Sequence, residues 1–270
     1  MIAKIFAQAA RSHGRQVLTQ LLIATVISTV ALATAFIPIP WLSSMMKGVV
    51  FGVLVATPFA VIVLVAESYW RTMYRDEGYF THSLPVRARD LFWGKALYIL
   101  AAEVAAFVFS AALGAATLFI FLVREQGWES ARIAVEALLA QVNGGGLALA
   151  ALVTLLWLFV NATAIPAMMS LGAQARWNSR GFLFPLVFLV GYYIVNQVVL
   201  AAATLFIPVS LDWGQGRVVF ESMLPQVVAN MRDGTPATIV GLGGIVFVPL
   251  LALAASWWAV RVIERRTSLR

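Results

Sequence analysis

The sequence predicts an all-α integral membrane protein with six transmembrane helices and both termini in the cytoplasm. Of its 270 residues, 61% are hydrophobic and only 11% are charged, and the mean hydropathy is +0.89. A soluble core could not bury that much apolar surface, so lipid must solvate much of the chain. Six apolar runs approach or exceed the roughly 20 residues that cross a hydrocarbon core of about 30 Å. We expect one transmembrane domain over residues 1–270.

The first element is expected to lie at the membrane surface. In residues 1–16, apolar side chains such as Ile5 and Phe6 follow helical spacing, while Lys4, Arg11 and Arg15 share the opposite face. That pattern is typical of an interfacial helix on the inner leaflet. The alternative is a cytoplasmic extension of the first span.

The apolar runs define the six spans in order. They cover residues 17–40, 48–66, 96–123, 146–169, 182–209 and 237–260. Fourteen Lys and Arg residues lie in the N-terminal arm, the second and fourth connections and the tail, against five on the other side. By the positive-inside rule, both termini and the second connection are therefore cytoplasmic.

Two external connections look structured. The residues of 128–142 place apolar and charged side chains on opposite faces, which predicts an amphipathic helix on the outer surface. Residues 210–236 carry apolar side chains at helical intervals, interrupted by Pro225. This external helical element either lies on the outer surface or enters the membrane and returns.

The cytoplasmic connection over residues 74–90 combines acids, aromatic side chains and a proline. Proline suits the first turn of a helix and breaks an interior, so Pro85 predicts a short helix ending near Ser83 and a new helix leading into the third span. Tyr79 and Phe80 beside charged residues are typical of a protein-docking surface. The alternative is a solvated loop whose aromatic side chains enter the headgroups.

The run RDEGYFTHSLPVRARDLFWGKAL, residues 75–97, resembles the segment between the second and third spans of ABC type-2 exporter permeases, the membrane subunits of ATP-binding-cassette exporters. The resemblance covers about 23 residues in sequence and the whole chain in architecture. In that family this segment is a coupling helix in a cleft of the ATPase subunit. The resemblance implies a contact surface formed by Asp76, Glu77, Tyr79, Phe80, His82 and Ser83, with Arg87 at its edge. Family members often have Ser where Arg87 stands.

The resemblance also implies a function and partners. The chain would be the permease subunit of an exporter in the cell membrane and would form half of a pathway for a hydrophobic or amphipathic substrate, such as a lipid, peptide or drug. Its partners would be two ATP-binding subunits and a second permease chain, identical or related. The phosphate-binding pattern G-x-x-x-x-G-K-[ST] does not occur in the sequence, so ATP and Mg²⁺ are expected on the partner and no cofactor on this chain. His13 or Arg15 could add to the ATPase contact.

Polar residues within the spans are few. Glu103 is the clear ionisable case, and it either faces a pathway, where it would meet a cationic substrate or a proton, or serves structure by pairing or by reaching the inner surface. Asn161, Asn196 and Gln197 are expected to bond between helices. A second functional hypothesis is a carrier driven by an ion gradient and coupled through Glu103.

Glycine positions bear on helix packing, and the composition bears on which other functions the sequence supports. Close helix approach is permitted by the small side chains at Gly48, Gly52, Gly241, Gly243 and Gly244. Two histidines and no cysteine give no basis for a histidine-rich or thiolate metal site, and scattered basic residues do not suggest a nucleic-acid partner. An intramembrane enzyme would need a catalytic cluster that the predicted spans, with one acid and no histidine, do not supply.

Overall fold

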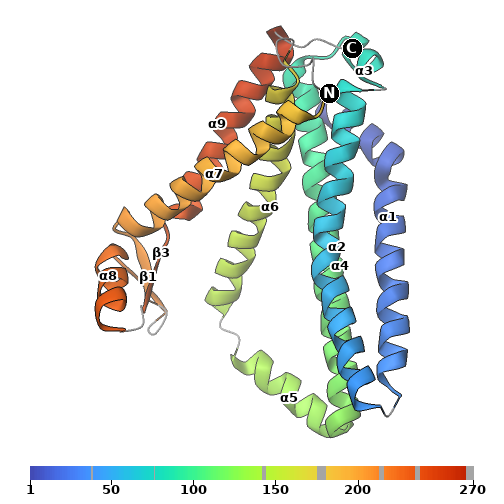
Figure 1. Cartoon of the computed structure of the whole chain (residues 1–270), viewed down its shortest axis with the longest axis vertical. Helices are drawn as coiled ribbons and strands as arrows, with labels where there is room; N and C mark the ends of the chain where they lie inside the picture. The colour runs from blue at the N-terminus through green and yellow to red at the C-terminus, as the bar shows by residue number, and fades with distance from the viewer. Residues whose placement is uncertain are drawn as a thin grey trace. The chain divides into compact units, whose positions relative to one another are not determined.

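The computed structural model describes residues 1–37, 39–75, 77–141, 144–174, 181–212, 216–234 and 238–265. Helices form most of this part of the chain (Figure 1). The elements are α1 (Ile2–Ala35), α2 (Pro40–Tyr74), α3 (Gly78–Ser83), α4 (Ala88–Gln126), α5 (Trp128–Gln141), α6 (Gly144–Gly172), α7 (Leu183–Phe206), β1 (Ser210–Asp212), β2 (Arg217–Val219), α8 (Leu224–Asp233), β3 (Ile239–Gly241) and α9 (Gly243–Arg265).

Six of the described helices are long and apolar enough to cross a membrane, namely α1, α2, α4, α6, α7 and α9. The predicted number of spans is confirmed, and the chain is a multi-pass, all-α membrane protein. The chain divides into two compact units. Unit 1 comprises residues 1–86 and 90–147, and unit 2 comprises residues 87–89 and 148–270.

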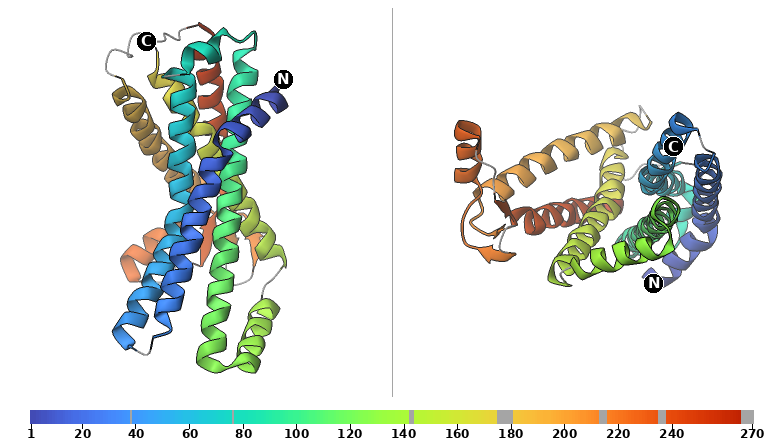
Figure 2. Two further views of the ribbon diagram at one scale, coloured as in Figure 1. Left: turned by 90° about the vertical axis from the view of Figure 1, so that its right-hand side faces the viewer. Right: turned by 90° about the horizontal axis from the view of Figure 1, so that it is seen from below.

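Unit 1 is built on α1, α2 and α4, which lie side by side (Figure 2). Each helix buries one face at intervals of three, four or seven residues, as helices packed lengthwise require. The buried faces are Val17, Ala24, Ser28, Ala31 and Ala35 on α1; Val50, Thr57, Val61, Val65, Ser68 and Thr72 on α2; and Ala96, Ile99, Glu103, Ala106, Ser110 and Thr117 on α4. Small residues dominate two of these faces, so the backbones can approach closely.

The N-terminal segment 1–16 is the first part of α1 and continues without interruption into the first span. Both alternatives considered for this segment predict a helix. Ile5 is buried, whereas Lys4, Arg11 and Arg15 are exposed, as the amphipathic pattern predicts.

Charged and aromatic contacts join the helices at the end of unit 1 that is remote from α3. Lys47 Nζ lies 2.5 Å from Glu125 Oε1, and Arg124 donates to the carbonyl oxygen of Phe36 at 2.7 Å. Gly127 then adopts a φ of +81°, which favours glycine, and turns the chain into α5. The predicted amphipathic helix is present as α5, with ion pairs from Arg132 to Glu129 and Glu136.

Unit 2 contains α6, α7 and α9. A Cβ on Gly243 would lie 2.2 Å from the carbonyl oxygen of Ala203, and one on Gly241 would lie 1.9 Å from that of Thr204, so the chain before α9 touches the end of α7. The predicted close approach is thus confirmed at these glycines and at Gly244, which faces Leu200. Gly48 and Gly52 lie on an exposed face of α2 and have no neighbour within 4 Å among the described residues.

The described residues of the segment 210–236 form one helix, α8, and the two strands β1 and β2. Strand β1 pairs antiparallel with both β2 and β3, in the order β2-β1-β3. The strands were not predicted. Pro225 lies in the first turn of α8 and therefore starts the helix instead of interrupting it.

Candidate functional site

The short helix α3 is held against the end of α2 by hydrogen bonds to the last carbonyl groups of α2. The hydroxyl of Thr81 donates to the carbonyl oxygen of Thr72 at 2.7 Å, and Nε2 of His82 lies 3.2 Å from that of Met73. The amide of Glu77 donates to the carbonyl of Arg71 at 3.4 Å. The last four carbonyls of a helix have no partner within it. The segment around α3 therefore caps α2.

This capping explains how a six-residue helix can keep a fixed position. An isolated helix of that length is unstable in water because the free-energy cost of helix nucleation exceeds the stabilisation from so few hydrogen bonds. Gly78 and Thr81 are buried against the rest of unit 1. The turn at Leu84 and Pro85 then leads into α4, which begins at Ala88. The sequence predicts this helix-turn-helix arrangement, and the structure has it.

His82 faces inward. Its ring centroid lies 6.2 Å from that of Tyr74, and its bond to Met73 requires a proton on Nε2. Burial lowers the pKa of His82 below its ordinary value of 6.5, and the positive charge of Lys95 lowers it further, while the bond to Met73 opposes both effects. The surroundings of His82 therefore favour the neutral imidazole over the charged one.

The outward face of α3 is aromatic. Tyr79 is 61% exposed and Phe80 is 63% exposed. Glu77, Ser83 and Arg87 are also exposed. Glu77 Oε1 lies 3.9 Å from Arg71 Nε, and the hydroxyl of Ser83 donates to the carbonyl of Phe80 at 2.8 Å.

The predicted contact residues thus divide between two roles. Tyr79 and Phe80, with Glu77 and Ser83, are exposed on the surface of unit 1, whereas His82 is hydrogen-bonded to the end of α2. Asp76 lies outside the described residues. Of the two residues suggested to extend this surface, Arg15 is exposed, but His13 is only 6% exposed and cannot serve as a contact.

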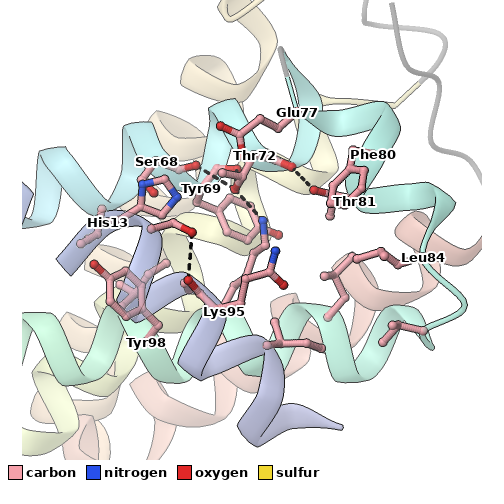
Figure 3. A pocket seen from close by; sticks show the side chains of 18 residues that line it. His13, Ser68, Tyr69, Thr72, Glu77, Phe80, Thr81, Leu84, Lys95 and Tyr98 are labelled. Carbon is pink, nitrogen blue, oxygen red and sulfur yellow. Dashed lines mark hydrogen bonds between the residues drawn. The ribbon is translucent and has the colours of Figure 1, made fainter. Parts of the chain in front are cut away.

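A cavity of about 100 Å³ lies beneath α3 (Figure 3). Its walls come from the start of α1, the end of α2, α3 with the following turn, and the start of α4. Lys95 Nζ donates to Thr72 Oγ1 at 2.5 Å, and Thr72 Oγ1 donates in turn to the carbonyl of Ser68 at 2.8 Å. The Tyr69 ring centroid lies 6.0 Å from the ammonium group. The sequence pattern did not predict this cavity.

The start of α1 closes one side of the cavity because it packs tightly on α4. A Cβ on Gly94 would lie 2.8 Å from the Cβ of Ile5, so glycine allows the two helices to touch. Phe6 and Tyr98 meet edge to face with ring centroids 6.3 Å apart. These contacts set His13, about two turns farther along α1, against the cavity.

The polar residues within the spans are dispersed. Glu103 is 1% exposed, and neither carboxylate oxygen has a hydrogen-bond partner among the described residues. Asn161 donates to the carbonyl of Trp157 in its own helix at 2.9 Å, so this bond is within one helix and not between helices. Asn196 Oδ1 is buried without a partner in the described part of the chain, and Gln197 is exposed.

Within the described ranges, no group of three or more His, Cys, Asp or Glu side chains could hold a metal ion. Comparison of the chain with protein-family models, with curated proteins and with solved structures gave no match. The proposals below therefore depend on the residues themselves.

Proposed function

We propose that this chain is the permease subunit of an ATP-binding-cassette exporter and that α3 is its contact with an ATPase subunit. The observation that carries the proposal is the exposed pair Tyr79 and Phe80 on a helix that is itself fixed to the end of α2. Large aromatic side chains on a positioned element are typical of interface hot spots. The resemblance of residues 75–97 to the coupling segment of type-2 exporters points to the same role.

The proposed complex contains two ATPase subunits, which bind ATP and Mg²⁺, and two permease chains in the cell membrane. The charge bias of the connections supports cytoplasmic termini and a cytoplasmic α3. The cargo would be a hydrophobic or amphipathic molecule.

The proposed mechanism uses the position of α3 between two spans. Closure of the ATPase subunits on ATP would push α3, which transmits the displacement to α2 through the capping bonds and to α4 through the turn at Pro85. Packed helices have discrete arrangements, so a small displacement would become a change between inward and outward opening.

Site-specific photo-crosslinking tests the contact. A benzoylphenylalanine at position 79, in chains expressed in the native host, should crosslink a soluble protein with a phosphate-binding G-x-x-x-x-G-K-[ST] motif. The double variant Tyr79→Ala, Phe80→Ala should release that protein on purification. The matched control is Phe220→Ala, which removes an aromatic side chain that is 83% exposed in the predicted external segment. Stoichiometric retention of the ATPase by the double variant would overturn the proposal.

A second candidate function is a carrier driven by an ion gradient, and the burial of Glu103 without a hydrogen-bond partner in the described residues favours it. A carboxyl group at such a position can gain and lose a proton during transport. Proteoliposomes under an imposed potential should then take up protons without nucleotide, and Glu103→Gln should abolish the uptake. Absence of nucleotide-independent proton uptake in the parent protein would favour the exporter.

A further inference from the structure

The cavity beneath α3 contains hydrogen-bonding groups that the protein leaves without partners. Nδ1 of His13 and the hydroxyl of Tyr98 have no hydrogen-bond partner among the described residues, although these side chains are only 6% and 7% exposed. Both side chains line the cavity. Buried polar groups are nearly always satisfied, so a ligand that enters the cavity could supply the hydrogen bonds of these two groups.

Lys95 supplies positive charge to the same cavity. Its ammonium group carries three protons, and the bond to Thr72 Oγ1 is its one hydrogen bond to a described residue. Thr72 cannot return a proton because its own hydroxyl donates to Ser68. Two protons of the Lys95 ammonium group are therefore available to an acceptor.

The other charges near the cavity leave its net charge positive. Glu77 lines the cavity, but its carboxylate is exposed and lies 3.9 Å from the Arg71 guanidinium, which opposes its charge. Lys95 and Glu77 are thus the charged residues that line the space, and Arg71, which lies beside Glu77 outside the lining, offsets the charge of that carboxylate. A ligand that satisfies Lys95 and accepts from the Tyr98 hydroxyl must be rich in acceptor oxygens and negatively charged.

The cavity extends along the helices from the edge of the hydrocarbon core, at Lys95, to the outer side of the headgroup layer, at Thr72. Lys95 immediately precedes the apolar run 96–123, and Thr72 lies six residues beyond the run 48–66, or about 9 Å along the helix axis. The headgroup regions add about 5 to 8 Å to each side of the hydrocarbon core. Basic pockets between spans at this depth are known to suit the phosphates of anionic lipids.

We propose that this cavity binds a single phosphoryl group, with Lys95, Tyr98 and His13 as its ligands. The volume of about 100 Å³ is several times the roughly 10–15 Å³ that one water requires, so one tetrahedral oxyanion has room in the cavity. The phosphoryl group belongs to an anionic phospholipid headgroup or to free phosphate. This site does not require that the chain be a permease.

Native mass spectrometry of the full-length, detergent-solubilised protein tests the site. The probes are dioleoyl phosphatidylglycerol, dioleoyl phosphatidylcholine and inorganic phosphate, each titrated separately. The parent protein should retain phosphatidylglycerol or phosphate at low micromolar concentration. Lys95→Gln should weaken that binding at least tenfold, and Tyr98→Phe, which removes one hydroxyl, should weaken it several-fold. Lys47→Gln, which removes a lysine at the other end of unit 1, should leave it unchanged.

The separate titrations distinguish the two sources of the phosphoryl group, an anionic phospholipid headgroup and free phosphate. Binding of phosphatidylglycerol in preference to phosphatidylcholine, with no binding of phosphate, supports a headgroup. Binding of inorganic phosphate that depends on Lys95 supports a free anion. If Lys95→Gln does not remain monodisperse, Tyr98→Phe carries the test. Two outcomes would overturn the proposal. In one, phosphatidylglycerol and phosphate both bind Tyr98→Phe as tightly as they bind the parent protein and Lys47→Gln. In the other, neither probe binds the parent protein.

Discussion

At the scale of single residues, the hydroxyl of Thr81 has the clearest structural task. It is the donor that joins α3 to the Thr72 carbonyl at the end of α2. The sequence could not reveal this task, because a threonine inside a short helix carries no sign that its partner is the carbonyl of another helix. It could reveal Tyr79 and Phe80, because exposed aromatic residues beside charges are unusual in an otherwise apolar chain.

Thr81→Val should loosen α3 while keeping the shape of the side chain. The change removes the hydrogen bond that the Thr72 carbonyl accepts from the Thr81 hydroxyl, which should destabilise the attachment of α3 by about 1 to 3 kcal/mol. Backbone amides of residues 78–83 should exchange faster with deuterium. Ser83→Ala is the matched control, since the Ser83 hydroxyl bonds only within α3 at an exposed position. Equal exchange in both variants would contradict the capping role.

Attachment of α3 should weaken at acidic pH. The pKa of His82 is lowered in the attached state, so the proton binds more tightly when α3 is released. Attachment is therefore fully stable above the ordinary value of 6.5 and weakens as the pH falls below it toward the lowered pKa. Amide exchange of residues 78–83, corrected for intrinsic rates, should rise between pH 7.5 and 5.5. His82→Gln, which keeps a donor but does not titrate, should remove this pH dependence.

At the scale of the elements, Gly94 determines how the start of α1 rests on α4. Gly94→Ala would place a methyl group 2.8 Å from the Cβ of Ile5, and the resulting overpacking should cost about 1 to 3 kcal/mol. Gly114→Ala is the matched control on the same helix, because its nearest neighbour would be the end of the Leu54 side chain at 3.4 Å. Thermal unfolding in detergent should show a lower midpoint for Gly94→Ala alone. A lower midpoint for both would implicate the loss of glycine itself.

The helices and strands also show which parts of the fold could be predicted from the sequence and which could not. The apolar runs located the six long helices, because lipid demands apolar side chains over a fixed length. The runs did not locate the helix ends. Helix α1 begins at Ile2 instead of near residue 17, since hydropathy changes at the membrane boundary while the backbone hydrogen bonds continue. The three-residue strands β1, β2 and β3 were missed because segments so short carry little periodic signal.

At the scale of the whole molecule, the charge bias predicts an orientation that labelling can test. The sequence contains no cysteine, so a single introduced cysteine reacts without background. Ser130→Cys on α5 should react with a membrane-impermeant maleimide in intact cells, whereas Ser83→Cys on α3 should react only after permeabilisation. Both serines are exposed, so accessibility within the fold is matched. The reverse pattern would place α3 outside and exclude a cytoplasmic ATPase as its partner.

The lengths of α2 and α4 have a consequence for how another protein could approach. Helix α2 continues eight residues beyond the apolar run 48–66, and α4 begins eight residues before the run 96–123. Both surpluses amount to about 12 Å of axial rise. That exceeds the headgroup thickness of about 5 to 8 Å per leaflet. The ends of α2 and α4 therefore hold α3 farther from the bilayer centre than the lipid phosphates. A water-soluble macromolecule could bind Tyr79 and Phe80 there without dehydrating or deforming the bilayer.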